Sequence, residues 1–492
     1  MEDELPLVLL KDVGQNSPLE QTGRSIIAAE SEVEAEQEDR SSFGRLLRAK
    51  TPRSSHGNWT PASDRPDPIE LIENQNADRL AWLVPLRRGR MSASPFSFYR
   101  GAATVMAADL ATTPTSGLQV QLCGDAHLAN FGVYASPERQ LVFDLNDFDE
   151  TLPGPFEWDV KRLAGSFVMA GRHRGFDADM QRRHAEAATR AYRTAMLRFA
   201  EQGWLDTWYS YLPLERFINL AKSRGVSKKQ ITRAEKFAAK AKSRDHLQAA
   251  SKLVERSNGG YRFKSTPPVL VPYRELPEAA EPDRLREAVH ASFNEYRESV
   301  NERTRSLVDR YRLVDAAIKV VGVGSVGTRC SVGLFLGRQP DDVLILQVKE
   351  ATDSVLEQHL PSSRFTLHGR RVVEGQRLMQ ASSDIFLGWS TSAAGRHFYW
   401  RQLRDWKGSV DLDVVTPELL GGSYAELCGW TLARAHAVSG DPAAIAGYLG
   451  QGDVFDRAMG EFAMRYSKQN LADYEAFRAA IADGGLDVDT AD

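Results

Sequence analysis

The side chains best suited to chemistry gather between residues 122 and 150. Asp125 and Asn130 lie five positions apart in GDAHLAN, and further acids, among them Asp144 and Asp147, follow in DLNDFDE. In phosphoryl transfer one carboxylate orients a hydroxyl nucleophile and can take its proton, while an amide oxygen and a second carboxylate offer hard oxygens to Mg²⁺. These residues therefore predict phosphoryl transfer. The alternative is a hairpin whose polar residues only cap its turns.

A β-hairpin is expected to carry these side chains. Asp125 follows an apolar run, residues 131–134 predict a short strand, residues 136–140 a turn, and residues 141–143 the returning strand. The acids crowd the end of that strand. Turns that merely contain several acids usually lack apolar strands that aim their side chains at one point, so the ordered set favours a functional loop.

The stretch resembles the catalytic and metal-binding segments of the protein-kinase-like superfamily, especially the aminoglycoside and small-molecule phosphotransferases. Those proteins have an HGDxxxxN loop before a strand that ends in ID[FW], and here Cys123 stands where they usually have histidine. The resemblance implies that Asp125 is the catalytic base and that Asn130 is a metal ligand. It implies Asp147, in the pair DF, as the second metal carboxylate, with Asp144 as the alternative.

Asp159 opens the next predicted helix. An Asp in this position accepts hydrogen bonds from the first backbone amides, so the sequence predicts an N-cap. The resemblance implies a second role, in which Asp159 braces the catalytic loop. A later apolar helix, predicted over residues 423–438, resembles the helix that precedes the catalytic loop in phosphotransferases. His436 in that helix is expected to be a packed core histidine.

A glycine-rich segment forms the second cluster. Gly322, Gly324, Ser325 and Gly327 lie in VGVGSVG, and the next predicted strand ends with Lys349 in QVKE. GxGxxG is a dinucleotide-binding fingerprint when a helix opens at the third glycine and an acid follows about 20 residues later. Here β-type residues follow and the strand carries a lysine. This favours the glycine loop and phosphate-binding lysine of a kinase-like small lobe.

The partner of the lysine is expected on a helix predicted over residues 369–380. Glu374 in that helix is set to pair with Lys349, and Glu350 and Glu357 are alternatives. Further strands predicted nearby complete a small antiparallel lobe of five strands, followed by a hinge beside the adenine, at 384–389, 397–403 and 405–408.

The order of these segments is reversed relative to a standard kinase, in which the small lobe precedes the catalytic loop. The chain thus resembles a circularly permuted α+β protein-kinase-like fold with a large helical lobe and a small five-stranded lobe. Permutation is permissible when the original termini lie close together. The whole pattern also resembles an uncharacterised bacterial family known only as domain of unknown function 2252. The predicted organisation is a disordered acidic tail, a large lobe with a helical insertion, a β-rich nucleotide-binding lobe and helices that complete the large lobe, at 1–55, 56–310, 311–408 and 409–492.

Arginines precede the catalytic loop. Arg87 and Arg88 are expected on a solvated face. Arg100 lies among aromatic residues in FSFYRG, directly before an apolar helix predicted over residues 102–110. A guanidinium in such surroundings must find an anion, either a buried carboxylate or a substrate phosphate.

The composition is that of a globular protein. The net charge is −4 over 492 residues, with 42% hydrophobic and 26% charged residues. So small a net charge argues against nucleic acid or an anionic membrane as a partner. Three widely spaced cysteines form neither a metal pattern nor a disulfide framework, which favours a reducing, cytoplasmic location. No apolar run approaches the length of a membrane span, and no secretory signal is expected.

Together these features predict an ATP- and Mg²⁺-dependent phosphotransferase that acts on a hydroxyl of a small molecule. The alternatives are an ATP-binding pseudokinase, an enzyme of the same fold that transfers AMP, and a non-catalytic protein that binds polyanions through the basic helices of residues 222–256. The helical segment 180–310 is expected to shape the acceptor pocket.

Overall fold

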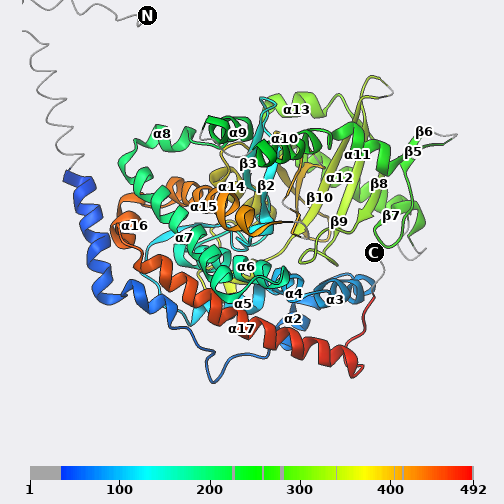
Figure 1. Cartoon of the computed structure of the whole chain (residues 1–492). Helices are drawn as coiled ribbons and strands as arrows, with labels where there is room; N and C mark the ends of the chain where they lie inside the picture. The colour runs from blue at the N-terminus through cyan, green and yellow to red at the C-terminus, as the bar shows by residue number, and fades with distance from the viewer. Residues whose placement is uncertain are drawn as a thin grey trace, which may run out of the picture.

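The computed structural model describes residues 35–489 except 224–227, 258–259, 277–281, 340, 404, 410 and 413–414. These residues form a mixed α+β fold in which helices surround several small antiparallel sheets (Figure 1). The expectation for residues 1–34 lies outside the described residues. Within the described residues, no helix combines the length and the apolar character needed to cross a membrane.

The largest sheet has six strands, and every neighbouring pair is antiparallel. Five strands come from the segment 311–408, as predicted. Residues 270–272, which precede that segment, add a sixth strand at one edge. The order is β11 (Gly388–Thr391), β12 (His397–Gln402), β10 (Val343–Ala351), β9 (Cys330–Leu336), β8 (Arg312–Lys319) and β7 (Leu270–Pro272).

The glycine-rich segment is the connection between β8 and β9, which pair antiparallel. A dinucleotide-binding unit requires a helix directly after the glycines and a parallel crossover to the next strand. Residues 320–329 form turns instead, and β9 follows them. The arrangement is therefore a glycine-rich hairpin, as the β-type residues after Gly327 predicted.

The predicted catalytic hairpin is also formed. β2 (Phe131–Ala135) and β3 (Leu141–Leu145) are antiparallel and fully buried, and β1 (Gln119–Leu122) pairs with β4 (Leu152–Pro155) beside them. Residues 405–408, expected as a hinge, join this hairpin: Val133 donates its N–H to Gly408 O at 2.7 Å and accepts one from Gly408 N at 3.0 Å. The segment after β12 is thus tied to the strand that follows the catalytic loop.

One hydrophobic core unites residues distant in sequence, drawing on residues 59–241 and 351–466. Its centre is the contact between α7 and α15, where Gly429 allows close approach, because a Cβ there would lie 2.3 Å from Ala188 O. Figure 1 shows α15, α16 and α17 against α6 and α7. The elements are α6 (Phe156–His173), α7 (Ala178–Glu201), α15 (Ala425–Ser439), α16 (Pro442–Leu449) and α17 (Val454–Ala482).

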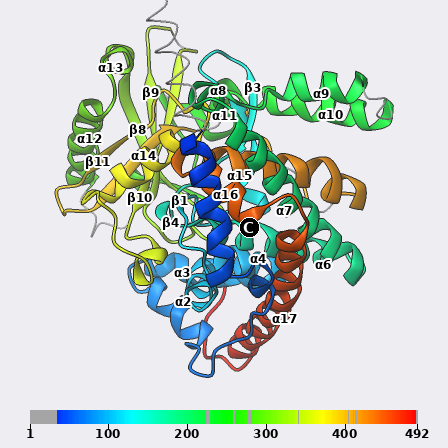
Figure 2. The same ribbon diagram turned by 90° about the vertical axis from the view of Figure 1, so that its left-hand side faces the viewer.

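The remaining helices lie around this core and the sheet. A first group precedes the catalytic hairpin, and a second group follows α7; α9 and α10 of the second group extend from the body as a pair (Figure 2). The first group is α2 (Pro68–Asn76), α3 (Val84–Ser92), α4 (Pro95–Gly101) and α5 (Ala103–Ala111). The second consists of α8 (Trp204–Tyr209), α9 (Leu214–Ser223), α10 (Lys228–Lys242), α11 (His246–Leu253), α12 (Pro282–Ser299) and α13 (Glu302–Val308). Between α11 and α12 lies a pair of antiparallel strands, β5 (Val254–Ser257) and β6 (Gly260–Phe263).

Part of the predicted acidic tail is structured, which corrects the sequence-based boundary. Residues 35–50 form a helix that packs against α16. Arg48 donates from Nε to Tyr448 O at 3.0 Å, and Gly44 lies so close to Ala444 O that a Cβ would meet it. The acidic composition of this tail suggested disorder. Arg48, near the end of the helix, instead donates hydrogen bonds to backbone carbonyls at the end of α16, which have no partner within that helix, and Gly44 allows the two helices to approach closely.

A buried histidine of this region gives the fold a pH dependence. His56 is fully buried, 2.7 Å from the Tyr448 hydroxyl, and burial, with the nearby Lys161 charge, lowers its pKa to about 2. The unfolded chain binds a proton there below about pH 6.5 and the folded chain does not, so the free energy of unfolding decreases as the pH is lowered below about 6.5. His56→Gln should make that slope shallower by up to about 1.4 kcal/mol per pH unit between pH 6.5 and 4, measured by urea unfolding. The same change at the exposed His290 should leave the slope unaltered, and equal slopes in all three proteins would contradict the assignment.

Candidate nucleotide and metal site

A cavity of about 640 Å³ brings the acidic and glycine-rich clusters together. The catalytic loop and the acids after β3 form one side, and the glycine-rich hairpin faces them. The lining residues that the sequence singled out include Asp125, Asn130, Asp147, Gly322, Gly324 and Ser325, together with Arg100, Glu350 and Glu357. Gly327 lies just outside, where its φ of +87° turns the hairpin against the Arg79 side chain.

The catalytic loop is held by a buried carboxylate. Asp159 accepts the N–H of Cys123 at 2.6 Å and of Gly124 at 3.0 Å, and its Oδ2 lies 3.3 Å from His436 Nε2. This is the bracing role that the resemblance implied, and His436 is a buried histidine as predicted. The N-cap prediction for Asp159 is wrong, because α6 begins earlier, at Phe156, and leaves the carboxylate free to reach the loop.

Removing that brace should destabilise the protein. Asp159→Ala leaves two buried backbone N–H groups without an acceptor, which costs about 1–3 kcal/mol for each group. We expect the free energy of unfolding, measured in urea, to fall by about 3 kcal/mol. The exposed Asp179→Ala should change it by less than about 0.5 kcal/mol. If Asp159→Ala were as stable as Asp179→Ala, Asp159 would not be holding the loop.

Asp125 is fixed by an arginine from α6. Arg162 contacts Asp125 Oδ1 through both Nε and Nη2, each at 2.7 Å, and its guanidinium lies over the Tyr99 ring. Burial would raise the pKa of Asp125, but Arg162 and then His127 outweigh it, so the pKa lies below its ordinary value. Oδ2 is 3.7 Å from His127 Nε2. Asp125 is thus an ionised carboxylate with one anchored oxygen and a second one facing the cavity side of the loop.

Asn130 closes the catalytic loop upon itself. Its Nδ2 donates to Asp125 O at 2.7 Å, so the side-chain oxygen is the atom that it can offer to a ligand. The loop is also joined to the end of β3, because Asn146 donates its N–H to Asn130 O at 2.8 Å. These two bonds set the distance between the loop and the acids that follow β3.

Lys349 lies between two carboxylates of the acidic cluster. Its Nζ is 2.5 Å from Asp149 Oδ2 and 3.7 Å from Asp147 Oδ1, although Lys349 is 200 residues away in the chain. Asp149 also accepts hydrogen bonds from the Tyr399 hydroxyl at 2.6 Å and from Ser325 Oγ at 3.4 Å. Lys349 and the acidic cluster, which the kinase-like resemblance puts in one site, are therefore in contact, although the buried Lys349 is not itself a lining residue of the cavity.

The partner of Lys349 was predicted wrongly. Glu374 lies in α14 (His368–Met379), 3.6 Å from Arg377 and 4.0 Å from Arg370, and Lys349 is paired with Asp149 instead. Asp149 is a cavity residue that sequence reasoning did not single out. The available signal was the alternation of acids in DFDE, which places Asp147 and Asp149 on the same side of an extended chain.

The two acids beside Lys349 differ in their bonding. Asp147 Oδ1 is buried and has no hydrogen-bond partner among the described residues, whereas both oxygens of Asp149 accept hydrogen bonds. Burial and then the Asp149 charge raise the pKa of Asp147; burial opposes the ionised form of Asp149, but Lys349 outweighs it and lowers the pKa. A buried carboxylate oxygen without a partner fits a cation ligand.

Asp144, the alternative metal carboxylate, is placed elsewhere. It is buried in β3, where Oδ1 accepts the N–H of Leu145 at 2.8 Å and Oδ2 accepts that of Ala381 at 2.9 Å. It is absent from the lining of the cavity. The alternation of strand side chains explains this, because Asp144 belongs to the hairpin, while Asp147 follows its end. Asp144 therefore ties the hairpin to the segment that follows α14, and Asp147 is the residue that fits a metal.

Arginines also line the cavity. Arg100 Nε is buried without a hydrogen-bond partner among the described residues. Burial lowers the pKa of Arg100, and the charges of Asp125 and Asp147 offset only part of that effect. Arg79 donates to Val326 O at 2.5 Å and holds the glycine-rich hairpin. Arg87, expected on a solvated face, is fully buried, because Asn76 Oδ1 and Gly101 O accept its hydrogen bonds. The cavity thus has a cationic wall, of which the sequence singled out Arg100 alone.

No described residue of the segment 180–310 lines this cavity. The described lining residues fall within 71–104, 125–150 and 322–362. The expectation rested on position in the chain alone, and the packing of α7 against α15 and α17 directs that part of the segment into the core. The helices that precede the catalytic loop, α2 to α5, take its place.

Comparison with known proteins gives one match. A family model described as "Uncharacterized protein conserved in bacteria (DUF2252)" matches residues 79–480, which include every cavity segment except its edge at residues 71–78. No curated protein and no solved structure matches the chain. The chain belongs to the DUF2252 family.

Proposed function

We propose that the protein is an ATP- and Mg²⁺-dependent phosphotransferase that acts on a hydroxyl of a small molecule, with a circularly permuted protein-kinase-like fold. The observation that carries the proposal is the meeting of three groups at one cavity. A braced loop presents Asp125 and Asn130, the acids after β3 lie beside Lys349, and a glycine-rich hairpin faces both. Positioning and charge neutralisation are what phosphoryl transfer asks of a protein.

In this proposal each group of residues at the cavity has its own role. Lys349 and the backbone N–H groups of residues 322–325 bind the phosphates, and Asp149 holds Lys349 in place. Asn130 and Asp147 would hold Mg²⁺, which neutralises phosphate charge when bound. The acceptor hydroxyl gives its proton to Asp125 as its oxygen bonds to the γ-phosphorus, and ADP leaves.

The cationic wall supports a polyphosphate ligand. The Nε of Arg100 is buried without a hydrogen-bond partner among the described residues, and such a guanidinium favours an anionic ligand. Acids and arginines around one cavity suit a metal-bound phosphate chain, which offers a cation to the acids and oxygens to the arginines. Carboxylates without neighbouring arginines would bind the metal ion but would repel the phosphate oxygens.

The permuted order is supported by the way the ends of the chain share one core. Residues 59–241 and 351–466 contribute to the same hydrophobic cluster, and the six-stranded sheet is formed largely by the segment between them. An apolar helix from the end of the chain, α15, therefore packs beside the loop that carries Asp125, and His436 of α15 contacts the brace Asp159.

Titration calorimetry with ATP and Mg²⁺ tests the proposal. Asp147→Ala and Lys349→Ala should each weaken binding at least about tenfold, which is 1.4 kcal/mol or more. Glu374→Gln, a matched acid of α14 that pairs with arginines outside the cavity, should bind like the natural protein. Unchanged binding in both cavity variants would refute the site.

Two alternatives have distinct signatures. Transfer of AMP would leave an adenylated acceptor in place of a phosphorylated one, which mass spectrometry of the products separates, and a pseudokinase would bind ATP without any product. The polyanion-binding alternative has less support, because Lys222 and Lys242 of the basic helices pair with Glu235 and Glu215. Steep salt dependence of nucleic-acid binding would revive it.

A further inference from the structure

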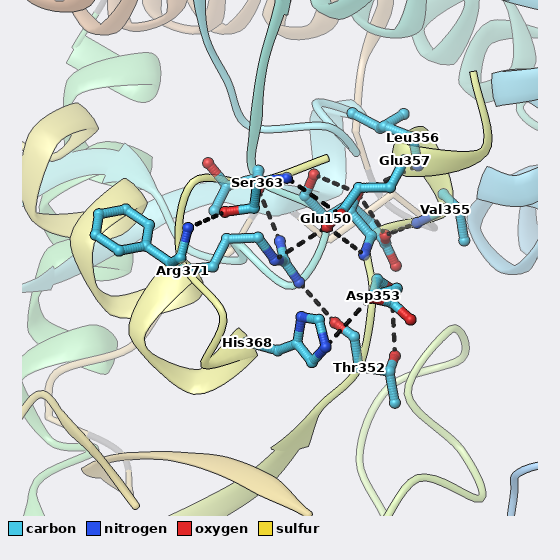
Figure 3. Close-up of polar contacts among 12 residues, drawn as sticks. Glu150, Thr352, Asp353, Val355, Leu356, Glu357, Ser363, His368 and Arg371 are labelled. Carbon is cyan, nitrogen blue, oxygen red and sulfur yellow. Dashed lines mark hydrogen bonds and ion pairs between the residues drawn. The ribbon is translucent and has the colours of Figure 1, made fainter. Parts of the chain in front are cut away.

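A cluster of metal-binding side chains lies at the rim of the cavity, apart from the residues proposed for Mg²⁺. Asp353, Glu357 and His368 each offer one ligand atom, and these atoms all lie within 4.8 Å of one another. His368 Nε2 is 3.1 Å from Asp353 Oδ1. Figure 3 shows the three side chains converging from the segment after β10 and from the start of α14.

The carboxylate of Glu357 is held in a fixed orientation. The short helix at Val355–Gln358 begins with a capping box, in which Ser354 donates its N–H to Glu357 Oε1 at 3.3 Å. Oε2 accepts the N–H of Ser363 at 3.2 Å, and only 11% of the side chain is exposed. Each oxygen keeps a second lone pair, so the carboxylate is preorganised and still able to bind a cation.

His368 offers a ring nitrogen to the cluster. Its Nε2 lies 3.1 Å from Asp353 Oδ1, and its backbone N–H donates to His397 Nδ1 at 3.1 Å, which fixes the start of α14. Nδ1 is buried and has no hydrogen-bond partner among the described residues, so that nitrogen does not tie the ring to another group. An imidazole is the commonest metal ligand in proteins.

The neighbouring cation does not occupy the cluster. Arg371 Nε lies 3.8 Å from Glu357 Oε1, but its two terminal nitrogens donate to the carbonyls of Asp149, Thr151 and Thr352 at 2.7–2.9 Å. The guanidinium is therefore committed to backbone oxygens on the other side. The carboxylates of Asp353 and Glu357 together make one contact with the Arg371 guanidinium, so their negative charge is not fully compensated by it and favours a further cation.

The ligand types identify the class of ion. Mg²⁺ prefers oxygen ligands only, whereas an imidazole with two carboxylates suits divalent transition metals such as Zn²⁺ and Mn²⁺. Ligand atoms about 2.1 Å from one ion lie on the order of 3–4 Å apart, so small side-chain rotations within the observed cluster suffice. Asp353, which is 77% exposed, leaves the site open to solvent.

We propose that Asp353, Glu357 and His368 bind one divalent transition-metal ion at the rim of the cavity. The site is tied to the acidic cluster, because Glu150 accepts hydrogen bonds from Ser354 Oγ and from Val355 N, at 3.1 and 2.7 Å (Figure 3). Bound metal therefore orders the cavity wall next to Asp149. The proposal stands on these side chains alone and does not require the nucleotide site.

Titration of the metal-free full-length protein with Co²⁺ tests the site, because cobalt reports its ligands through visible absorption bands. The natural protein should bind one ion. His368→Gln and the exposed Asp353→Asn should each weaken binding by at least about tenfold, the smallest loss seen when even an outer partner of a metal ligand is removed. His359→Gln, an exposed histidine of the same segment, is the matched control and should bind normally.

The other outcomes overturn the proposal. Absence of binding, or equal binding by all variants, would show that the cluster is only a set of ion pairs. Loss of cobalt binding in Asp147→Ala but not in His368→Gln would place the ion in the acidic cluster instead. Mg²⁺–ATP binding by His368→Gln, measured separately, reports on the nucleotide site, so failure of one proposal is distinguishable from failure of the other.

Discussion

Asparagine in place of Asp125 should lower the rate of γ-phosphoryl transfer by about 10²–10⁴-fold, the usual contribution of a general base. The substitution keeps the shape of the side chain and one acceptor for Arg162, so the catalytic loop should remain folded. The charge that orients the nucleophile and receives its proton is lost. The slow hydrolysis of ATP, in which water replaces the acceptor, allows the rate to be measured before an acceptor is identified.

Asp144→Asn is the matched control for this experiment. Asp144 is a buried acid only a few residues from the cavity, but its oxygens accept backbone N–H groups. We expect this variant to be less stable and to retain the rate per folded molecule. The assignment of Asp125 would be contradicted if the two variants lost activity equally, or if Asp125→Asn hydrolysed ATP at the rate of the natural protein.

Methionine in place of Lys349 should give the largest loss of stability in the site. Lys349 is 1% exposed, and its ammonium compensates Asp147 and Asp149, which a neutral side chain leaves side by side. Breaking a buried ion pair by removing one partner costs about 3–5 kcal/mol. Because the two carboxylates are about one-third exposed, at 33% and 30%, we expect a smaller loss, about 2–4 kcal/mol.

Urea unfolding without nucleotide measures that loss. The double variant Lys349→Met/Asp149→Asn removes one of the two repelling charges and should recover part of the stability. If the lysine were a solvated side chain with no role in the pair, the single variant would be as stable as the natural protein and the second change would recover nothing.

The sequence predicted the local elements of the site well, because their signals are local. Two short apolar strands joined by a polar turn predict the hairpin around Asp144, and β-type residues after Gly327 predict the glycine-rich hairpin. The meeting of Lys349 with the acidic cluster was predicted only through a resemblance. Its partner, Asp149, was missed because an acidic run does not say which of its members will face a residue 200 positions away.

The cationic wall could not be predicted for a different reason. Arg100 stood out by its aromatic neighbours, but Arg87 was expected on a solvated face, and only the packing of α2 to α5 decides that it is buried at the same cavity. The same holds for the helix of residues 35–50, whose acidic composition suggested disorder. Its order comes from contacts with α16, about 400 residues away, which no local pattern encodes.

Crystallography with Mn²⁺ and a non-hydrolysable ATP analogue tests the central claim most directly. Anomalous scattering should locate an ion about 2.2 Å from the side-chain oxygens of Asn130 and Asp147, a distance typical of hard cations. The phosphates of the analogue should lie between Lys349 and the glycine-rich hairpin. An analogue bound in another cavity, with no ion at Asn130 and Asp147, would contradict the account.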